Sequence, residues 1–375
     1  MKDKSVGKLL LFFLFVLMTP LLAGCSLSFT SSGIKVEGIG DGGIFMTTNS
    51  GDSWKQVSAI PAINGQSRSL GSEDIKDIAI DPNDHQTLYL ATLDRGLWYT
   101  NDIRNGWQQI SSLEEKKIQT VQVDPQNKCT LYVLSKNQVF KTDNCGRDFQ
   151  QIYQDDDEEV VLITIAIDDL NNSNLYLGDS RGNILKSIDQ GTSWRVIKSL
   201  ETRSPVMKIL VNPKNSRQIF LASKDRLVYS FISNTKTNPD NSEEIAQNFA
   251  VNNFQSYNSI LENLEIDGEY RSLVISNDGE LFLATNASLA RSKDQGNTWE
   301  KLTILTTDDQ VEIVSLVINP NDAKEIYYLT SNTIFRSVDN GTSWATKKLP
   351  TTRSGSKLLI DYQDPAVIYL GVIQK

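Results

Sequence analysis

Aspartates that recur in a fixed frame are the residues of this chain whose type and spacing most readily suggest chemistry. Each stands in the pattern Ser/Thr-x-Asp/Asn-x-Gly-x-Ser/Thr-Trp. A carboxylate in such a frame could bind calcium or take part in acid–base catalysis. It could also shape a turn, because Asp and Asn oxygens accept backbone hydrogen bonds and Gly adopts positive φ without steric cost. Turn chemistry accounts for every residue type in the frame, so we predict a structural role for these aspartates.

The full copies of the frame share an acidic or amide residue, a glycine and a tryptophan. They comprise Asn49, Gly51 and Trp54; Asp189, Gly191 and Trp194; Asp294, Gly296 and Trp299; and Asp339, Gly341 and Trp344. Degenerate copies run from Thr100 to Trp107 and from Thr142 to Phe149. We expect the tryptophan to bury its ring between neighbouring sheets.

Histidine and cysteine chemistry is limited by the composition. The single histidine, His85, disfavours histidine-rich metal sites and a Ser-His-Asp triad. Cys129 and Cys145 flank a predicted hairpin that turns near Lys136, which makes them neighbours across antiparallel strands. An oxidising compartment would favour a disulfide between them, and a reducing one would leave two thiols. We predict no catalytic residue, no metal site and no cofactor.

A sequence motif that is repeated seven times predicts the strands that position these residues. An aliphatic residue precedes Asp, Asn or Ser, often Pro, and then an aliphatic–aromatic run. The copies begin at Ile80, Val123, Ile167, Val211, Ile275, Ile318 and Ile360. They lie 43, 44, 44, 64, 43 and 42 positions apart, the period of a four-stranded propeller blade. We predict an all-β fold, a single β-propeller of seven blades, with strands A to D from the centre outwards.

The two ends of the repeat array are expected to share one blade. Residues 43–57 supply only strands C and D, and residues 357–372 supply only strands A and B. Neither half can bury its apolar face alone. Together they complete the seventh blade and leave only short, protected sheet edges.

The longest interval marks a repeat that lacks the aspartate frame. Its strand C is predicted at Arg226–Ser230 and its strand D at Tyr257–Ile260, which makes residues 231–256 an insertion. A rival interpretation makes residues 242–264 one helix, because apolar residues there are spaced four and three apart. The insertion could contact a partner or be a tolerated surface excursion.

The repeated frame resembles the Asp-box, or BNR repeat, of sialidases, sortilin-type ectodomains, xyloglucanases and photosystem II assembly factors. The resemblance covers residues 43–373 and implies that the boxes lie away from the ligand-binding face. That face carries the B–C and D–A loops, including an acidic run at 155–159. Basic residues in the B–C loops could form a rim for an acidic or glycan partner, with ordinary solvated charge as the alternative. They are Arg95, Arg181, Lys224 and Arg226.

The first residues form a targeting segment. Three lysines precede an apolar run from Leu9 to Leu22, and the following Ala-Gly-Cys25 resembles the end of a bacterial lipobox. We expect residues 1–24 to be a lipoprotein signal peptide, with an ordinary secretory signal as the alternative. Cys25 would carry the lipid and residues 25–42 would tether the propeller of residues 43–375 to the cell membrane or outer membrane, outside the cytoplasm.

The net charge and the predicted fold disfavour several classes of function. The net charge is −9, and removing three signal lysines makes it more negative, which disfavours nucleic acid. Glycosidases need two carboxylates across a cleft, and no arginine-led motif like that of sialidases is visible. Photosystem II assembly factors favour Gly-Trp in strand B, where this chain has Leu-Tyr-Leu. We expect a monomeric, non-catalytic binding or scaffold module for an envelope protein or glycan. A glycoside hydrolase and an assembly factor for a membrane complex are the alternatives.

Overall fold

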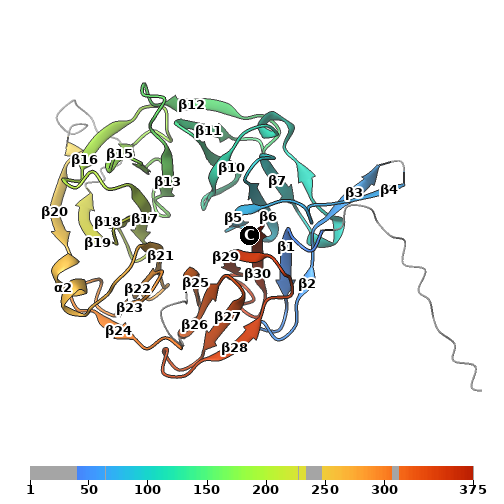
Figure 1. Cartoon of the computed structure of the whole chain (residues 1–375). Coiled ribbons are helices and arrows are strands. Elements are labelled where there is room, and N and C mark those ends of the chain that lie inside the picture. The colour runs from blue at the N-terminus through green and yellow to red at the C-terminus, as the bar shows by residue number, and fades with distance from the viewer. Residues whose placement is uncertain (1–39, 64, 227, 234–246, 306–311, 375) are drawn as a thin grey trace, which may run out of the picture. The chain divides into compact units, whose positions relative to one another are not determined.

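Seven four-stranded sheets stand around one axis in the part of the chain that the structure describes (Figure 1). This computed structural model describes residues 40–374 apart from 64, 227, 234–246 and 306–311. The innermost strand of each sheet contacts the innermost strands of both neighbours, so the ring is closed. The predicted all-β, seven-bladed propeller is confirmed. The expected signal peptide, Cys25 and most of the tether lie outside the described residues.

The first four blades follow one another along the chain. Blade 1 contains β5 (Ile75–Asp81), β6 (Asp84–Thr92), β7 (Leu97–Thr100) and β8 (Gln108–Gln109). Blade 2 contains β9 (Ile118–Asp124), β10 (Asn127–Ser135), β11 (Gln138–Thr142) and β12 (Gln150–Gln154). Blade 3 contains β13 (Leu162–Ile167), β14 (Leu175–Asp179), β15 (Asn183–Ser187) and β16 (Arg195–Ser199). Blade 4 contains β17 (Val206–Asn212), β18 (Asn215–Ser223), β19 (Val228–Ser233) and β20 (Val251–Ser256).

The last three blades complete the ring. Blade 5 contains β21 (Tyr270–Ile275), β22 (Leu281–Thr285), β23 (Leu289–Ser292) and β24 (Glu300–Leu302). Blade 6 contains β25 (Ile313–Asn319), β26 (Asp322–Thr330), β27 (Thr333–Ser337) and β28 (Ala345–Lys348). Blade 7 contains β29 (Ser354–Ile360) and β30 (Ile368–Ile373) from the C-terminal end, with β1 (Ile44–Thr47) and β2 (Lys55–Gln56) from the N-terminal end.

The repeated sequence motif forms the hairpin of strands A and B in each blade. Asp81 ends β5, and its Oδ1 accepts a hydrogen bond from the backbone N–H of Asn83 at 2.7 Å, which fixes the A–B turn. Leu88, Tyr89 and Leu90 of the next strand are all buried. Strand B is covered by neighbouring blades on both faces, which explains why its apolar run does not alternate with polar residues.

Blade 7 closes the ring as the sequence predicts. Strand β1 pairs with β30 in an antiparallel register that places Phe45 opposite Leu370 and Thr47 opposite Ile368. One element was not predicted: β3 (Ala59–Ile63) and β4 (Gln66–Ser69) form a separate hairpin between blades 7 and 1. Its side chains are mostly exposed, so apolar patterning gives no signal for it.

Blade 4 departs from the prediction at its outer edge. Strand D is β20, Val251–Ser256, and the predicted strand at Tyr257–Ile260 is instead part of helix α2 (Asn258–Asn263) and its N-cap. The predicted strand at Tyr257–Ile260 is therefore wrong, and the rival helix of residues 242–264 is wrong in extent, because residues 251–256 are a strand. Tyr257 and Leu261 are buried at helical spacing, whereas Phe254 stacks with Phe231 of strand C at 6.2 Å.

The connection between strands C and D of blade 4 is correspondingly shorter than residues 231–256. It runs from residue 234 to 250, and its described part is held by Lys186 of blade 3. The buried Lys186 Nζ donates to the Asn248 carbonyl at 2.7 Å and to Ser233 Oγ at 3.0 Å. A strand lysine from the neighbouring blade thus anchors this connection where an Asp-box is absent.

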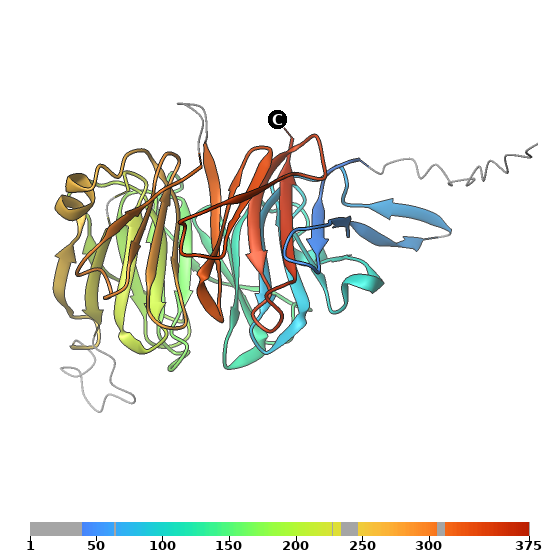
Figure 2. The ribbon, with the colours of Figure 1, turned by 90° about the horizontal axis from the view of Figure 1, so that it is seen from below.

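The two faces of the ring carry different connections. We call the face with the A–B and C–D turns the box face, because residues 47–54, 187–194, 292–299 and 337–344 lie there. The opposite face, with the B–C and D–A loops that include residues 93–96, 180–182, 200–205 and 224–226, is the loop face. Helix α2 lies on the loop face (Figure 2). Within the described residues, no helix is long and apolar enough to cross a membrane.

Candidate functional site

The Asp-boxes use their polar groups within the turn. Asp189 Oδ1 accepts hydrogen bonds from Ser187 Oγ and the Ser193 N–H, both at 2.8 Å, and Oδ2 accepts from Ser193 Oγ at 2.6 Å. The Gly191 N–H donates to Ser187 Oγ at 2.8 Å. The boxes at Asn49, Asp294 and Asp339 repeat these contacts. Hydrogen bonds from Ser343 and Ser337 lower the pKa of Asp339 to about 2.

A second feature of the box was not predicted from its sequence. The residue before the glycine is also left-handed: φ is 57° at Gln190 and 89° at Gly191. This turn aims the Gln190 N–H at the Ser173 carbonyl, 3.1 Å away at the start of strand B. The junction recurs at Ser50 and Asn340. These three boxes are therefore fixed to the adjacent A–B hairpin as well as within their own turn.

The degenerate copy in blade 2 preserves the whole arrangement. Asn144 takes the place of the aspartate, and Cys145 is the left-handed residue before Gly146. The Cys145 N–H donates to the Cys129 carbonyl at 3.0 Å, and the two cysteines are joined by a disulfide, the pairing expected from the sequence. In blade 1, by contrast, a single 3₁₀ turn at Ile103–Asn105 replaces the box.

The indole N–H groups of the box tryptophans are used in hydrogen bonds to backbone carbonyls. The indole N–H groups of Trp54, Trp194 and Trp299 donate to the carbonyl of the glycine in the same box, at 3.0–3.2 Å. That of Trp344 donates to Thr303 of the preceding blade at 2.7 Å. Trp299 is fully buried and the other three are half-buried. Among the described residues, no group of His, Cys, Asp and Glu is placed to hold a metal ion.

The four basic residues singled out in the sequence all lie on the loop face, but they do not form a bare cationic rim. Arg95 pairs with Glu73 at 3.5 Å, Arg181 with Asp157, and Arg226 with Asp267 at 4.0 Å. Each acid comes from a neighbouring D–A loop. The fourth, Lys224, pairs its backbone with Pro205 and Tyr270. Three of the four predicted cations are therefore neutralised by acids on this face.

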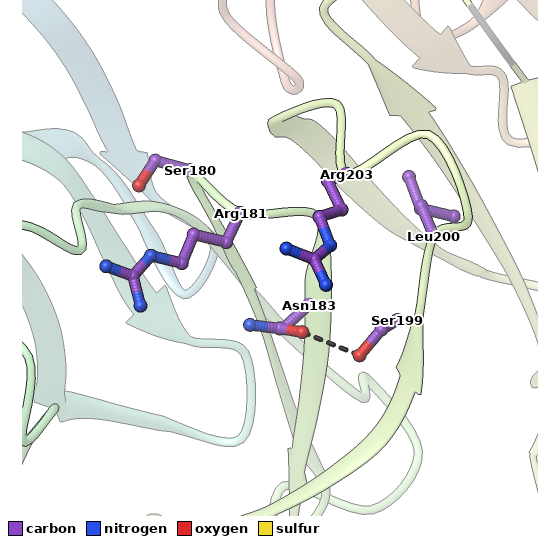
Figure 3. Close-up of a pocket in the computed structure, with 6 residues that line it drawn as sticks. All are labelled: Ser180, Arg181, Asn183, Ser199, Leu200 and Arg203. Carbon is purple, nitrogen blue, oxygen red and sulfur yellow. Dashed lines mark hydrogen bonds between the residues drawn. The ribbon is translucent and has the colours of Figure 1, made fainter.

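A pocket of about 380 Å³ opens on the loop face of blade 3. Its lining holds two guanidinium groups, two hydroxyls and an amide, and no carboxylate. The residues are Ser180, Arg181, Asn183, Ser199, Leu200 and Arg203. Figure 3 shows the Arg203 side chain directed toward Asn183 and Ser199, with Arg181 extending away from them.

The pocket is built on a tight B–C loop. Buried Asp179 ends strand B and accepts hydrogen bonds from the backbone of Arg181 and from the backbone and side chain of Asn183, all at 2.8 Å. Gly182 has φ of 81°, and a Cβ there would lie 2.9 Å from the Ser204 carbonyl oxygen. The D–A loop can approach this closely only because residue 182 is glycine. Asn183 Oδ1 in turn accepts from Ser199 Oγ at 2.6 Å.

Arg203 is the cation of this pocket without an acidic partner. It is exposed, its φ is 51°, and no carboxylate of the described chain lies within ion-pair distance of it. Arg203 was not predicted from the sequence, because it lies in a D–A loop and the predicted basic rim consists of B–C loop residues. Only the fold brings it beside Arg181.

Two further pockets adjoin blade 4 on the same side of the ring. One, of about 310 Å³, shares Leu200 with the first, and its other lining residues are Lys198, Glu201, Thr202, Tyr229, Phe254 and Ser256. Lys198 Nζ lies 4.8 Å above the Phe254 ring. The other, of about 220 Å³, contains Asp225, Arg226, Asn258, Leu261 and Glu262.

The closed ring and the repeated boxes define the chain as an Asp-box β-propeller. Residues 287–373, in blades 5 to 7, match the Sortilin-Vps10 family model, described as sortilin, neurotensin receptor 3. No curated protein sequence matches the chain.

Solved propellers share the fold at low sequence identity. The structure of YCF48 bound to D1 peptide aligns with a TM-score of 0.58 and 15% identity, over 81% of this chain and 94% of that one. YCF48 from Cyanidioschyzon merolae aligns at 0.55 and 10%, over 84% and 97%. The GH74 enzyme of Niastella koreensis aligns at 0.61 and 14%, over 84% and 53%. The chain thus spans about half of that enzyme, and these likenesses concern the fold alone.

Proposed function

We propose that this chain is a non-catalytic binding or scaffold module of the bacterial cell envelope, holding an anionic group of a protein or glycan partner at Arg203. The main support for this proposal is that Arg203 presents an exposed guanidinium in a pocket whose lining contains no carboxylate. A guanidinium presents a planar fork of donors that matches carboxylate or phosphate geometry. Ser180, Asn183 and Ser199 add polar contacts at the wall.

The adjoining aromatic pocket supports a partner with an apolar or sugar-ring portion next to its anionic group. Tyr229 and Phe254 lie with ring centroids 5.1 Å apart, and Leu200 connects their pocket to that of Arg203. Aromatic faces contribute contact area at little conformational cost, and they accept the faces of sugar rings as well as apolar side chains.

We also propose that a lipid on Cys25 anchors the chain to a membrane. Cys25, outside the described residues, would receive the lipid and hold the chain at the membrane. Cys25→Ala is expected to abolish incorporation of a labelled fatty acid and to move the chain into the aqueous phase of a detergent partition. Incorporation that persists in Cys25→Ala would refute lipidation at this residue.

The binding proposal is tested with the tagged full-length chain as bait in an envelope extract. Wild type and Arg147→Glu, an exposed charge reversal on the box face, should retain the same partner, whereas Arg203→Glu should lose it. A captured polysaccharide would make the module carbohydrate-binding, and a captured subunit of a membrane complex would make it an assembly factor. Equal recovery by all three baits would place binding elsewhere.

One observation favours a hydrolase as the second candidate. The blade 4 pocket of about 220 Å³ contains two carboxylates, Asp225 and Glu262, and glycosidases use such pairs. The GH74 likeness is consistent with this but extends over only about half of those enzymes. Turnover of a glycan by wild type, lost in both Asp225→Asn and Glu262→Gln, would establish this alternative over the non-catalytic one.

A further inference from the structure

The two pockets that share Leu200 are both lined by the end of strand β16 and the turn that follows it. Lys198 and Ser199 are neighbours in this strand, and successive side chains of a strand point to opposite faces. Lys198 therefore lines the pocket of about 310 Å³, and Ser199 lines the pocket of about 380 Å³. Beyond the strand, the Arg203 N–H donates to the Leu200 carbonyl at 3.0 Å. This turn returns the Arg203 side chain to the larger pocket, so one segment of seven or fewer residues serves both pockets.

Aromatic rings of blade 4 hold the Lys198 ammonium in place. Its Nζ lies 4.8 Å from the centre of the Phe254 ring, within the range of a cation–π contact. Phe254 is fixed in turn by two rings of strand C, those of Phe231 and Tyr229, whose centroids lie 6.2 and 5.1 Å away. An ammonium group has three donors, and a ring face covers only one side of it. Lys198 is therefore positioned and still able to donate hydrogen bonds to a ligand.

Lys198 and Arg203 both lack an acidic partner. Within the described residues, no carboxylate lies within ion-pair distance of either group. Arg95, Arg181 and Arg226 of the loop face differ in this respect, because each of them pairs with an acid. The surface around Leu200 therefore offers two unpaired cations to a ligand, one in each of two adjoining pockets.

The rest of the lining favours a polyanion that also carries hydroxyl groups. Glu201 is the one acid among the residues that line the two pockets, and it is exposed. An ionised carboxylate only accepts hydrogen bonds, so a ligand beside Glu201 must supply a donor, and polyphosphate has none. A sugar ring combines hydroxyl donors with an apolar face that packs on aromatic rings. Hydroxyls and aromatic rings also line the two pockets, at Ser199, Thr202, Ser256, Tyr229 and Phe254.

We propose that the two pockets form one binding site for an acidic polysaccharide, with an anionic group of one sugar at Arg203 and that of a neighbouring sugar at Lys198. Hydroxyls of the sugars donate to Glu201. This inference rests on the proposed anion site at Arg203 and names the class of ligand that occupies it. The chain as a whole has a net charge of −9, so attraction of the polyanion depends on these local cations and weakens as salt is added.

The test titrates the purified full-length chain with polygalacturonate, polyglutamate and polyphosphate of matched charge. Polygalacturonate is expected to bind wild type most tightly. Lys198→Met and Arg203→Gln should each weaken this binding roughly three- to tenfold, since each removes a charged hydrogen-bond donor. Methionine keeps the packing on Phe254, because its thioether also contacts aromatic rings favourably. Lys55→Met is the matched control and should bind as wild type does, because Lys55 is an exposed strand D lysine of blade 7 that lines neither pocket.

The two substitutions distinguish failure of this inference from failure of the proposed function. Weakened binding by Arg203→Gln with wild-type binding by Lys198→Met would overturn the two-pocket site and leave the proposed anion site at Arg203 intact. Wild-type binding by both variants would contradict both proposals. Tighter binding of polyglutamate or polyphosphate than of polygalacturonate would overturn the assignment to a polysaccharide, and so would a failure of polygalacturonate to bind wild type.

A second measurement needs no variant and so does not depend on folding of the substituted chains. Methyl-esterified polygalacturonate keeps its sugar rings and most of its hydroxyls but loses its negative charges. It should bind wild type at least about tenfold more weakly than polygalacturonate, because a charge-assisted hydrogen bond is roughly twice as strong as a neutral one. Equal binding of the two polymers would show that the cations do not hold the carboxylates, and would overturn the proposal.

Discussion

The box face and the loop face are built from the ends of the same strands, yet they differ in whether their polar groups have partners within the protein. On the box face, the Asp189 carboxylate accepts three hydrogen bonds within its own turn, and the turn is bonded to the neighbouring hairpin. On the loop face, Arg203 has no acidic partner among the described residues, and the buried Ser204 hydroxyl has no hydrogen bond. Satisfied groups contribute to stability, whereas unsatisfied ones at a pocket are available to a ligand.

The two faces show that the repeat constrains residue types in the box turns and leaves those in the loops free to vary. The boxes recur because every blade needs the same turn, so their aspartates report on folding. The loops vary because no blade-to-blade rule constrains them, so their residues can be selected for binding. Substitutions on the box face should therefore change stability without changing binding, and those in the Arg203 pocket should do the reverse.

The largest effect is expected from opening the ring. Deleting residues 355–375 removes β30 with the buried Ile368, Tyr369, Leu370 and Val372. At about 1.5–3 kcal/mol for each buried side chain, the loss is comparable to the whole stability of a domain. We expect an aggregating or unfolded product without a cooperative melting transition. An unchanged melting temperature would contradict closure by the C-terminal strands, and deletion of residues 374–375 alone serves as the control.

The disulfide of blade 2 should rank second. Cys129 and Cys145 are 16 residues apart, and closing a loop of that length stabilises the folded state by about 3 kcal/mol. Replacing both cysteines by serine should lower the free energy of unfolding by about that amount, measured in denaturant. A reductant should destabilise wild type and leave the double variant unaffected. Equal sensitivity of both proteins to the reductant would show that the bridge does not form in solution.

An Asp-box substitution should cost less. Asp189→Ala removes the acceptor of three hydrogen bonds in a partly exposed turn and should cost about 1–2 kcal/mol. Asp189→Asn should cost less, since an asparagine already serves in the box of Asn49. Both should bind the envelope partner as wild type does. Loss of binding by Asp189→Ala with stability retained would assign the box a functional role.

The acid dependence of a box is a smaller effect with a definite sign. The folded-state pKa of Asp339 is lowered to about 2 by hydrogen bonds from Ser343 and Ser337. A carboxyl group whose pKa falls on folding stabilises the folded state above its unfolded pKa, near 3.8, and that contribution is lost as the pH falls toward 2. The stability difference between wild type and Asp339→Asn should shrink over this window. A difference independent of pH would contradict the hydrogen-bonded carboxylate.

The sequence was sufficient to predict the ring but not the pocket. Blade number, closure and box turns follow from the period of the sequence repeat, because every blade packs against its neighbours in the same way and uses the same residue types. The helix at Asn258–Asn263 was predicted as a strand because Tyr257 and Ile260 repeat the aromatic-x-x-aliphatic form of Trp194 and Ile197 at the start of strand D in blade 3. Arg203 was missed because it is 22 residues from Arg181, and only the return of the chain along blade 3 brings the two loops together.

The smallest expected effect on stability belongs to Arg203→Glu, and it provides the most direct test of the division between the faces. The melting temperature should stay within a degree or so of wild type, because surface substitutions typically change stability by less than about 0.5 kcal/mol. Capture of the envelope partner should nevertheless be lost, while Arg147→Glu on the box face retains it. Undiminished capture by Arg203→Glu would contradict the assignment of binding to the loop face of blade 3.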